Sequence, residues 1–473
     1  MAIELSNLTF TEQDDIVPSS GVEQILNTGV ANTLAGNDSI TGDTTSTYET
    51  LPGFYNSGTL NTDDGNDTIT GIGYAELPYQ GVGVYNIGII ETGNGNDRIT
   101  GMSKSWGIQS LSGTINTGND NDTIMGIADS FVDFPGTGIS ISNSILDTGK
   151  GDDVITGSTN SGKGIENIQS TFNTGDGNDT IIGNSPSGGW GIINGGSMDT
   201  GNGNDIITGN GASDVDRVFV GSGIINSGTI NTGNGADSII AHIEDRQLFP
   251  SNVRGIGIAN GGTINTGEGA DSIRVEGGFT NRGGVFLGEG NDSITALSLP
   301  ELDLPNRVLE NFNAIETGDG DDTITTTGVI YNEGVINTGN GNDSIIVDGG
   351  IDDITSTTYG IYNNGGAINM GDGNDSIIAN EGFESGPNSS GAWFLGEGDD
   401  YIKGFGSGDF YGGNGNDLLE LTPGSYTVGR WGATVTLSKG SSLMLASEFE
   451  QLKAGGIMYN FAKLTAGQTI VVV

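Results

Sequence analysis

The chain has 473 residues, with 60 acidic side chains, 15 basic side chains and a formal net charge of −45. Such an acidic surface repels nucleic acid and anionic lipid, so neither is expected as a partner. There is no cysteine, which excludes disulfides and thiolate metal sites, and the 86 glycines do not follow the period of collagen.

The first segment, residues 1–23, lacks any repeat, and we expect it to form an N-terminal cap. It has no basic n-region and no apolar h-region, so a cleavable signal peptide is not predicted. No apolar run in the chain reaches the roughly 18 residues that a membrane helix needs, so no transmembrane segment is predicted.

A nine-residue phrase, seen plainly at Thr92–Thr100, then occurs fifteen times within residues 24–421. Its sixth position is always aspartate, and two residues later stands isoleucine, or Leu419 in the last copy. Repetition on this scale predicts a stack of coils, each of which buries its faces against its neighbours. The fifteen aspartates are Asp38, Asp67, Asp97, Asp122, Asp153, Asp179, Asp205, Asp237, Asp271, Asp292, Asp322, Asp343, Asp375, Asp400 and Asp417.

The nine residues before each phrase repeat in a different form, as in Gly223–Asn231, with asparagine fourth, glycine sixth and an apolar residue eighth. The two halves predict a coil with two turns and two short strands. Side chains alternate along a strand, so the eighth residues of both halves, such as Ile90 and Ile99, are expected to form two facing apolar ladders. Helices are excluded because each glycine costs about 1 kcal/mol relative to alanine.

The spacing between successive aspartates varies from 17 to 34 residues, and the extra residues follow the strand of the aspartate half. Such loops on one side of a repeat array are often a binding face, and the alternative is that they only cover an apolar margin. Both interpretations stay open. The loops carry the aromatic residues Tyr48, Tyr74, Phe131, Phe134, Phe219 and Phe249.

After residue 421 the phrase stops, and residues 422–473 are expected to form a C-terminal β cap. Within it we predict strands at Ser425–Leu437, Ser441–Glu450 and Thr469–Val473, with a break at Gly455. The predicted fold class is therefore all-β. It is a right-handed parallel β-solenoid, a β-roll or β-helix, of about fifteen irregular coils with terminal caps.

The phrase resembles the calcium-binding nonapeptide of the hemolysin-type (RTX) family, glycine-glycine-x-glycine-x-aspartate-x-aliphatic-x. Gly412–Glu420 matches every fixed position, whereas most copies begin with threonine, as at Thr92 and Thr338. The resemblance implies a parallel β-roll with calcium between consecutive turns, held by backbone carbonyls and by the fifteen aspartates. The chemistry agrees, because calcium takes six to eight oxygen ligands and glycines let carbonyls converge.

The family carries the aspartate turn on both sides of the coil, whereas this chain has asparagine and glycine on one side. We therefore expect one row of calcium ions, weakened at the early turns by Leu34, Asp63 and Asp120 and best formed at Asp400 and Asp417. A metal-free solenoid held by aspartate–backbone hydrogen bonds is the alternative. Opposite the metal row we expect stacked asparagines at Asn27, Asn56, Asn86, Asn194, Asn226, Asn260, Asn281 and Asn332.

The resemblance also implies a bacterial protein of the extracellular space or cell surface, exported by type I secretion without an N-terminal signal. The apolar tail Ile470–Val473 is compatible with a secretion signal of that kind. Calcium would then fold the chain outside the cell. We expect a structural role in a surface layer, sheath, filament or adhesion module, with self-association or a cell-surface polysaccharide as the partner.

Catalysis is not expected. The single histidine, His242, lies in an insertion, excludes a two-histidine zinc protease motif and has no nucleophile elbow beside it. A polysaccharide lyase or epimerase is the alternative, and aspartate clustered with lysine or arginine in one groove would favour it. An ice-binding solenoid is a second alternative, suggested by Thr68-Ile69-Thr70, although Arg98 and Tyr401 interrupt the threonine row.

Overall fold

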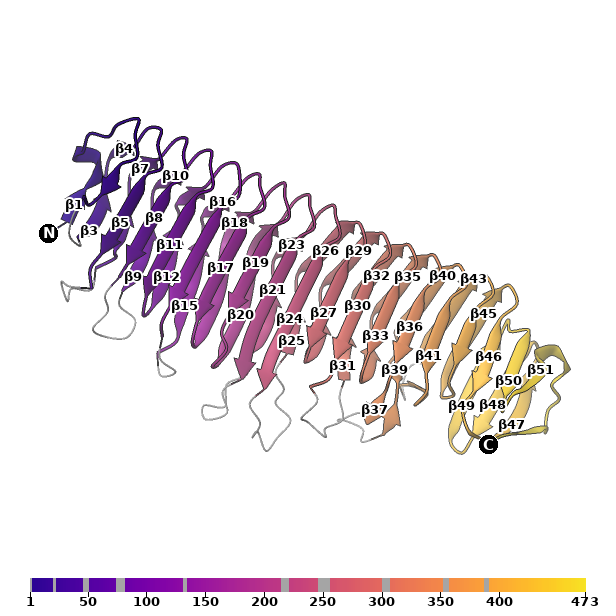
Figure 1. The fold of residues 1–473 in the computed structure, drawn as a ribbon. Coiled ribbons are helices and arrows are strands. Elements are labelled where there is room, and N and C mark those ends of the chain that lie inside the picture. The colour runs from indigo at the N-terminus through magenta and orange to yellow at the C-terminus, as the bar shows by residue number, and fades with distance from the viewer. Residues whose placement is uncertain are drawn as a thin grey trace. The chain divides into compact units, whose positions relative to one another are not determined.

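The computed structural model describes residues 2–19, 23–45, 51–73, 81–130, 134–213, 221–245, 256–299, 307–351, 357–386 and 391–473. It divides into two compact units, Met1–Asn265 and Thr266–Val473. In each unit, short strands follow one another in parallel layers in the order of the sequence (Figure 1). This arrangement confirms the predicted fold class, an all-β parallel solenoid. No helix among the described residues is long and apolar enough to cross a membrane.

A typical coil has three strands, and not the two that the sequence predicted. In one coil these are β11 (Arg98–Ser103), β12 (Trp106–Leu111) and β13 (Thr114–Asn116). The half without aspartate makes two strands because the chain bends at its asparagine turn. We call the three sets the aspartate row, the middle row and the third row of strands.

The strands of the first unit pair in parallel with their counterparts one coil before and after, as Ile99 does with Ile69 and Ile124. The aspartate row also contains β5 (Ser39–Asp43), β8 (Thr68–Ile72), β14 (Thr123–Ala128), β17 (Val154–Thr159), β19 (Thr180–Asn184), β21 (Ile206–Ser213) and β24 (Ser238–Asp245). The middle row also contains β3 (Gln24–Asn27), β6 (Phe54–Asn56), β9 (Val82–Asn86), β15 (Gly136–Ser142), β22 (Ser222–Asn226) and β25 (Ile256–Asn260). The third row also contains β4 (Val30–Asn32), β7 (Thr59–Asn61), β10 (Ile89–Glu91), β16 (Ile145–Asp147), β23 (Thr229–Asn231) and β26 (Thr263–Glu268), whereas β18 (Gly162–Asn173) and β20 (Gly189–Asp199) run through both rows.

The second unit repeats this arrangement with shorter middle strands. Its aspartate row is β27 (Ser272–Glu276), β30 (Ser293–Leu297), β33 (Thr323–Thr326), β36 (Ser344–Val347), β41 (Ser376–Ala379), β44 (Tyr401–Lys403) and β46 (Leu418–Leu421). Its middle row is β28 (Gly278–Asn281), β31 (Arg307–Asn311), β34 (Val329–Asn332), β39 (Ile361–Asn363) and β42 (Phe383–Ser385). Its third row is β29 (Gly284–Glu289), β32 (Ala314–Asp319), β35 (Val335–Asn340), β40 (Ala367–Asp372), β43 (Ala392–Glu397) and β45 (Gly408–Asn414). In addition, β37 (Gly350–Ile351) pairs antiparallel with β38 (Thr358–Tyr359) in a separate two-stranded sheet.

The core is a thin layer of aliphatic side chains, one from each strand of a coil. Ile99, Ile108 and Ile115 are all fully buried, and burial of such a side chain contributes about 1.5–3 kcal/mol. The two predicted ladders are confirmed, and the middle row adds a third that the sequence reading missed. The rows approach closely because glycine stands where they cross. A Cβ on Gly101 would lie 2.1 Å from the carbonyl oxygen of Gly107.

The N-terminal segment continues the stack. Its strands β1 (Ala2–Glu4) and β2 (Ile16–Val17) pair in parallel with β3 and β5, and the short 3-10 helix η1 (Leu5–Asn7) lies between them in sequence. Residues 2–17 therefore form a degenerate coil that stacks on the coil of β3 and β5.

The C-terminal segment combines one further coil with antiparallel strands. The strands β49 (Ser442–Ser447) and β50 (Gln451–Ala454) pair in parallel with β45 and β46. Antiparallel partners lie on both sides of these two strands in sequence. β47 (Gly424–Trp431) and β48 (Thr434–Lys439) precede them, and β51 (Ile457–Asn460) and β52 (Thr469–Val472) follow, with the 3-10 helix η2 at Phe461–Lys463. The single strand predicted at Ser425–Leu437 is a hairpin that turns at Gly432, whereas the predicted break at Gly455 is confirmed.

Most insertions leave the coil after an aspartate-row strand, as predicted. Of the six aromatic residues singled out in them, Phe134 lies in the described part and is 39% exposed. The other five, Tyr48, Tyr74, Phe131, Phe219 and Phe249, lie outside the described residues. The expectation that His242 lies in an insertion is wrong, because β24 extends to Asp245 and pairs His242 with Asn210.

Candidate metal centre

The fifteen aspartates form one row in each unit, from Asp38 to Asp237 in the first and from Asp271 to Asp417 in the second. Each stands at the junction between the glycine turn and the aspartate-row strand. Every one of them is at most 2% exposed. The carboxylates therefore lie inside the coils, and the turns carry other residues on their outer surface.

From Asp38 to Asp237 in the first unit and from Asp292 to Asp417 in the second, one carboxylate oxygen of each aspartate accepts a hydrogen bond from the preceding coil. The backbone N–H of Asp122 donates to Oδ1 of Asp153 at 2.7 Å, and the N–H of Asp153 donates to Oδ1 of Asp179 at 2.8 Å. The same bond recurs along both rows at 2.7–2.9 Å. Each aspartate thus ties its coil to the coil before it.

The two ends of this ladder use acidic residues that the sequence reading missed. The N–H of Asp15 donates to Asp38 Oδ1 at 2.8 Å, and the N–H of Asp417 donates to Glu450 Oε2 at 2.8 Å. The sequence could have identified both residues, because an aliphatic residue, Val17 or Leu452, stands two positions after each of them, as it does after every aspartate of the phrase.

The second carboxylate oxygen has a different environment. Among the described residues, Oδ2 is buried with no hydrogen-bond partner in Asp38, Asp67, Asp97, Asp122, Asp153, Asp179, Asp205, Asp292, Asp322, Asp343, Asp375, Asp400 and Asp417. A Cβ built on Gly412 would lie 2.8 Å from Oδ2 of Asp417, so this oxygen faces the first position of the phrase. That position is usually threonine. The hydroxyl of Thr92 donates to the carbonyl of Thr117 at 3.1 Å, and it also lies close enough to the carboxyl of Asp97 to act against the raised pKa of that group.

Burial raises the pKa of the row. It raises the pKa of Asp122 to about 8 and that of Asp153 to about 7, although the threonine hydroxyl and the backbone N–H act in the opposite direction. The exposed neighbour Asp152 shows the reverse effect, because hydrogen bonds from Asn178 lower its pKa. A buried row of like charges needs a neutralising partner, which is either a proton or a cation.

The donor atoms of the row fit calcium in type. A buried carboxylate oxygen without a partner is a hard anionic ligand of the kind that calcium prefers. Within the described part of the chain, no three histidine, aspartate or glutamate side chains converge on one point. A cation between coils would therefore take two successive aspartates, and its other ligands would be hydroxyl or carbonyl oxygens.

The turns are already closed by hydrogen bonds between coils, which fits the metal-free alternative equally well. The N–H of Asn202 donates to the carbonyl of Gly175 at 3.1 Å, and the N–H of Gly177 donates to the carbonyl of Asn202 at 2.8 Å. Together with the Oδ1 bonds, these contacts hold successive turns in register.

A second ladder, absent from the sequence expectations, runs along the outside of the turns. The N–H of Asn178 donates to Asp152 Oδ1 at 2.8 Å, and the N–H of Asn204 donates to Asn178 Oδ1 at 2.9 Å. The side chains of this outer ladder accept from N–H groups of the following coil, whereas the buried aspartates accept from N–H groups of the preceding coil. The sequence feature that could have predicted this ladder is the asparagine or aspartate at the fifth position of thirteen of the fifteen copies.

The predicted asparagine row is confirmed on the opposite side of the coil. Asn226 Nδ2 donates to Asn260 Oδ1 at 2.9 Å and to the carbonyl of Thr263 at 2.8 Å. The same pairing links Asn27, Asn56 and Asn86, then Asn167, Asn194 and Asn226, and in the second unit Asn281, Asn311, Asn332 and Asn363.

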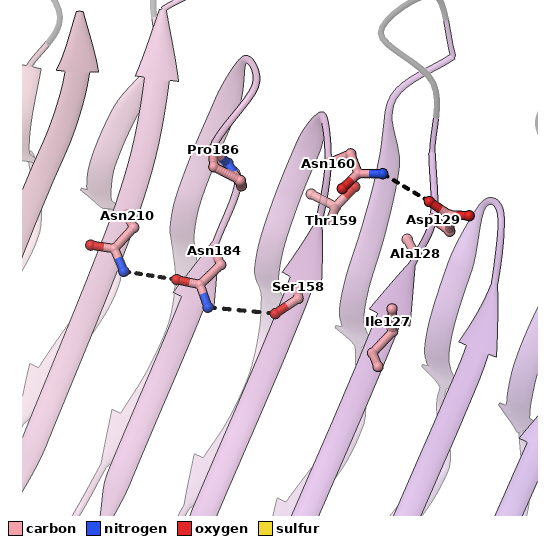
Figure 2. Close-up of a pocket in the computed structure, with 9 residues that line it drawn as sticks. All are labelled: Ile127, Ala128, Asp129, Ser158, Thr159, Asn160, Asn184, Pro186 and Asn210. Carbon is pink, nitrogen blue, oxygen red and sulfur yellow. Dashed lines mark hydrogen bonds between the residues drawn. The ribbon is translucent and has the colours of Figure 1, made fainter.

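An open pocket of about 590 Å³ lies in the first unit beside the ends of β14, β17, β19 and β21 (Figure 2). Asn210 Nδ2 donates to Asn184 Oδ1 at 2.7 Å, and Asn160 Nδ2 donates to Asp129 Oδ1 at 2.8 Å. The lining has one carboxylate and no basic side chain, so this pocket lacks the acid–base cluster that a lyase or epimerase would need. The lining residues are Ile127, Ala128, Asp129, Ser158, Thr159, Asn160, Asn184, Pro186 and Asn210.

The outer side of the aspartate-row strands carries the interrupted threonine row. Arg98 pairs directly with Thr68 on one side and with Thr123 on the other. In the second unit, Tyr401 follows Ser376 in the same way. A continuous threonine surface is therefore absent from these coils.

No family model matches the chain, and no curated protein matches it. Among solved structures, the X-ray crystal structure of a hyperactive, Ca2+-dependent, β-helical antifreeze protein from an Antarctic bacterium aligns with it at 18% identity. The alignment covers 85% of this chain and 82% of that chain, with a TM-score of 0.34. A similarity of this size supports no statement about what this chain binds.

Proposed function

We propose that the chain is an extracellular structural solenoid, a unit of a surface layer, sheath, filament or adhesion module, whose buried aspartates are neutralised by calcium. The observation that carries the proposal is the unpaired, buried Oδ2 atom that recurs from coil to coil, as in Asp153 and Asp179. At a strand spacing of about 4.8 Å and an effective dielectric of about 20, two such carboxylates repel by roughly 3 kcal/mol.

Calcium would supply the missing positive charge between successive aspartates, and Asp400 with Asp417 is the pair that we expect to bind best. Extracellular calcium is present at about the millimolar level at which weak extracellular modules bind. The proposed route is type I secretion, so that the chain meets this calcium only after export. The proposed partners are further copies of the chain or a cell-surface polysaccharide.

We propose no catalytic role. The repeats occupy most of the chain, and the pocket at β14–β21 offers Asp129 without a lysine or arginine beside it. Activity on acidic polysaccharides would contradict this. The ice-binding alternative predicts thermal hysteresis, which the interruption by Arg98 argues against.

Calorimetry of chelator-treated protein tests the calcium proposal. We expect the melting temperature to rise saturably with added calcium and much less with magnesium, because magnesium sheds its water reluctantly. Isothermal titration should show several ions per chain, and circular dichroism in chelator should show reduced β-structure. A melting temperature that is the same with chelator and with calcium would overturn the proposal.

A second candidate keeps the structural role and replaces calcium by protons. The hydrogen bonds that already close the turns between coils, together with the pKa of Asp122 that burial raises, favour it. In that case the solenoid is fully folded in chelator, and acidification alone increases its stability. The same calorimetric series therefore separates the two candidates.

A further inference from the structure

The N-terminal end of the solenoid presents open strand edges. Among the described residues, β1 pairs only with β3, and β2 pairs only with β5. The other edge of each strand carries backbone N–H and C=O groups that could accept a further strand. Apolar side chains flank this end, because Ile16 is 65% exposed and Val30 is 74% exposed.

The C-terminal end also presents strand edges. Over residues 391–473, β51 pairs only with β50, and β52 pairs only with β47. Exposed apolar side chains accompany these edges as well. Ile457 is 57% exposed, Met458 is 50% exposed and Val471 is 61% exposed.

The two ends differ in charge. Residues 1–23 contain five acidic side chains and no basic one. Residues 422–473 contain four basic and two acidic side chains, so this segment is net positive in a chain whose formal charge is −45. Glu12 at the first end and Lys463 at the second are both exposed.

We propose that the acidic N-terminal end of one copy docks on the basic C-terminal end of a second copy, so that the chains add head to tail. The proposal rests on the structural role proposed above and names the partner. Opposite charges favour this pairing, whereas two N-terminal or two C-terminal ends repel each other. Because the two contacting surfaces differ, the contact is head to tail, and it generates a filament when successive rotations do not close into a ring.

Strand addition supplies the backbone part of the contact. Open strand edges on both copies can exchange main-chain hydrogen bonds, and the exposed Ile16 and Ile457 leave water when the ends meet. Strand edges that stay exposed would otherwise favour nonspecific aggregation. Pairing them with a second copy removes that risk.

Sedimentation velocity of the full chain in calcium, over a wide concentration range, tests the proposal. We expect masses at integer multiples of the monomer, with weaker association at high salt, and unbranched filaments one molecule wide in electron micrographs. Ile457→Ser should reduce association. The matched control is Ile206→Ser, an isoleucine that is 40% exposed on β21 of the first unit, and it should assemble like the parent.

Charge reversal tests the pairing of unlike ends. Glu12→Lys and Lys463→Glu should each weaken association at low salt, and the double variant should regain part of it, because opposite charges again face each other. A chain that stays monomeric at every concentration overturns the proposal, as does assembly that Ile206→Ser disrupts and Ile457→Ser leaves intact. Either result leaves the calcium proposal standing if the melting temperature still responds to calcium.

Discussion

Asp152 and Asp153 are adjacent in sequence and have opposite environments. Asp152 is exposed on the outside of the turn, where Asn178 donates to it from both its N–H and its side chain. Asp153 is fully buried inside the coil, with Oδ1 held by the N–H of Asp122 and Oδ2 unpaired. Only the second of these carboxylates needs a neutralising partner.

This pair provides a matched test at the scale of single residues. In chelator at neutral pH, Asp153→Asn should raise stability by about 1–3 kcal/mol, because the amide is neutral and its oxygen can still accept the N–H of Asp122. In calcium, the same substitution should lower the number of ions bound, which equilibrium dialysis measures. Asp152→Asn removes the same charge, but it should neither raise stability in chelator nor lower the number of calcium ions bound.

If the two variants behave alike in both conditions, the buried row has no special electrostatic role. If Asp153→Asn stabilises the protein equally with and without calcium, the row is neutralised by protons and the metal is dispensable.

At the scale of the element, the glycine turn is what brings successive coils together. Gly203 has φ of +146°, and a Cβ added to it would lie 1.6 Å from the carbonyl oxygen of Gly177. The turn survives without glycine at some places, since Leu34, Asp63 and Asp120 adopt φ of 65°, 64° and 79°. These three residues, at which weaker calcium binding is expected, therefore keep the path of the turn at the cost of backbone strain.

Gly203→Ala should accordingly lower the free energy of unfolding by about 3 kcal/mol, since it combines an unfavourable φ with a backbone clash. The control is Gly278→Ala, because no atom lies within 4 Å of a Cβ at Gly278, and the change should stay within about 0.5 kcal/mol. Urea unfolding of both variants measures the difference. Equal effects would mean that the turns can move apart freely.

At the scale of the whole molecule, the effect of the aspartate row on stability is the sum over many buried carboxyls. Burial raises the pKa of Asp67, Asp205 and Asp375 to about 7, well above the ordinary value of 3.8. A carboxyl whose pKa is raised by folding stabilises the fold when it is protonated. That stability is fully present below the unfolded pKa and is lost as the pH rises through the folded values.

In chelator, the melting temperature should therefore fall steadily between about pH 4 and about pH 8, because the buried carboxyls lose their protons over this range. Calcium should restore more stability at about pH 8 than at about pH 5, because protons compete with the metal for the same oxygens. Calorimetry at a series of pH values with and without calcium measures both trends. A chelated protein that gains stability as the pH rises would contradict the raised pKa of the row.

Much of this architecture was predictable from the sequence because it depends on local repetition. The aspartate-half strands, the inward ladders containing Ile90 and Ile99, and the asparagine row through Asn226 follow from a fixed order of glycine, polar and aliphatic residues. The position of most insertions follows from the same order. These features depend on neighbours within one coil, and every coil repeats them.

Only the tertiary structure decided where the aspartates point. The sequence placed Asp153 at a turn, but the direction of its side chain depends on the φ of Gly151, 140°, and on the N–H of Asp122, which is 31 residues earlier. The third strand of each coil and the roles of Asp15 and Glu450 were hidden for the same reason. A sequence order specifies which groups are available, whereas the partner of a buried carboxylate is set by the coil stacked against it.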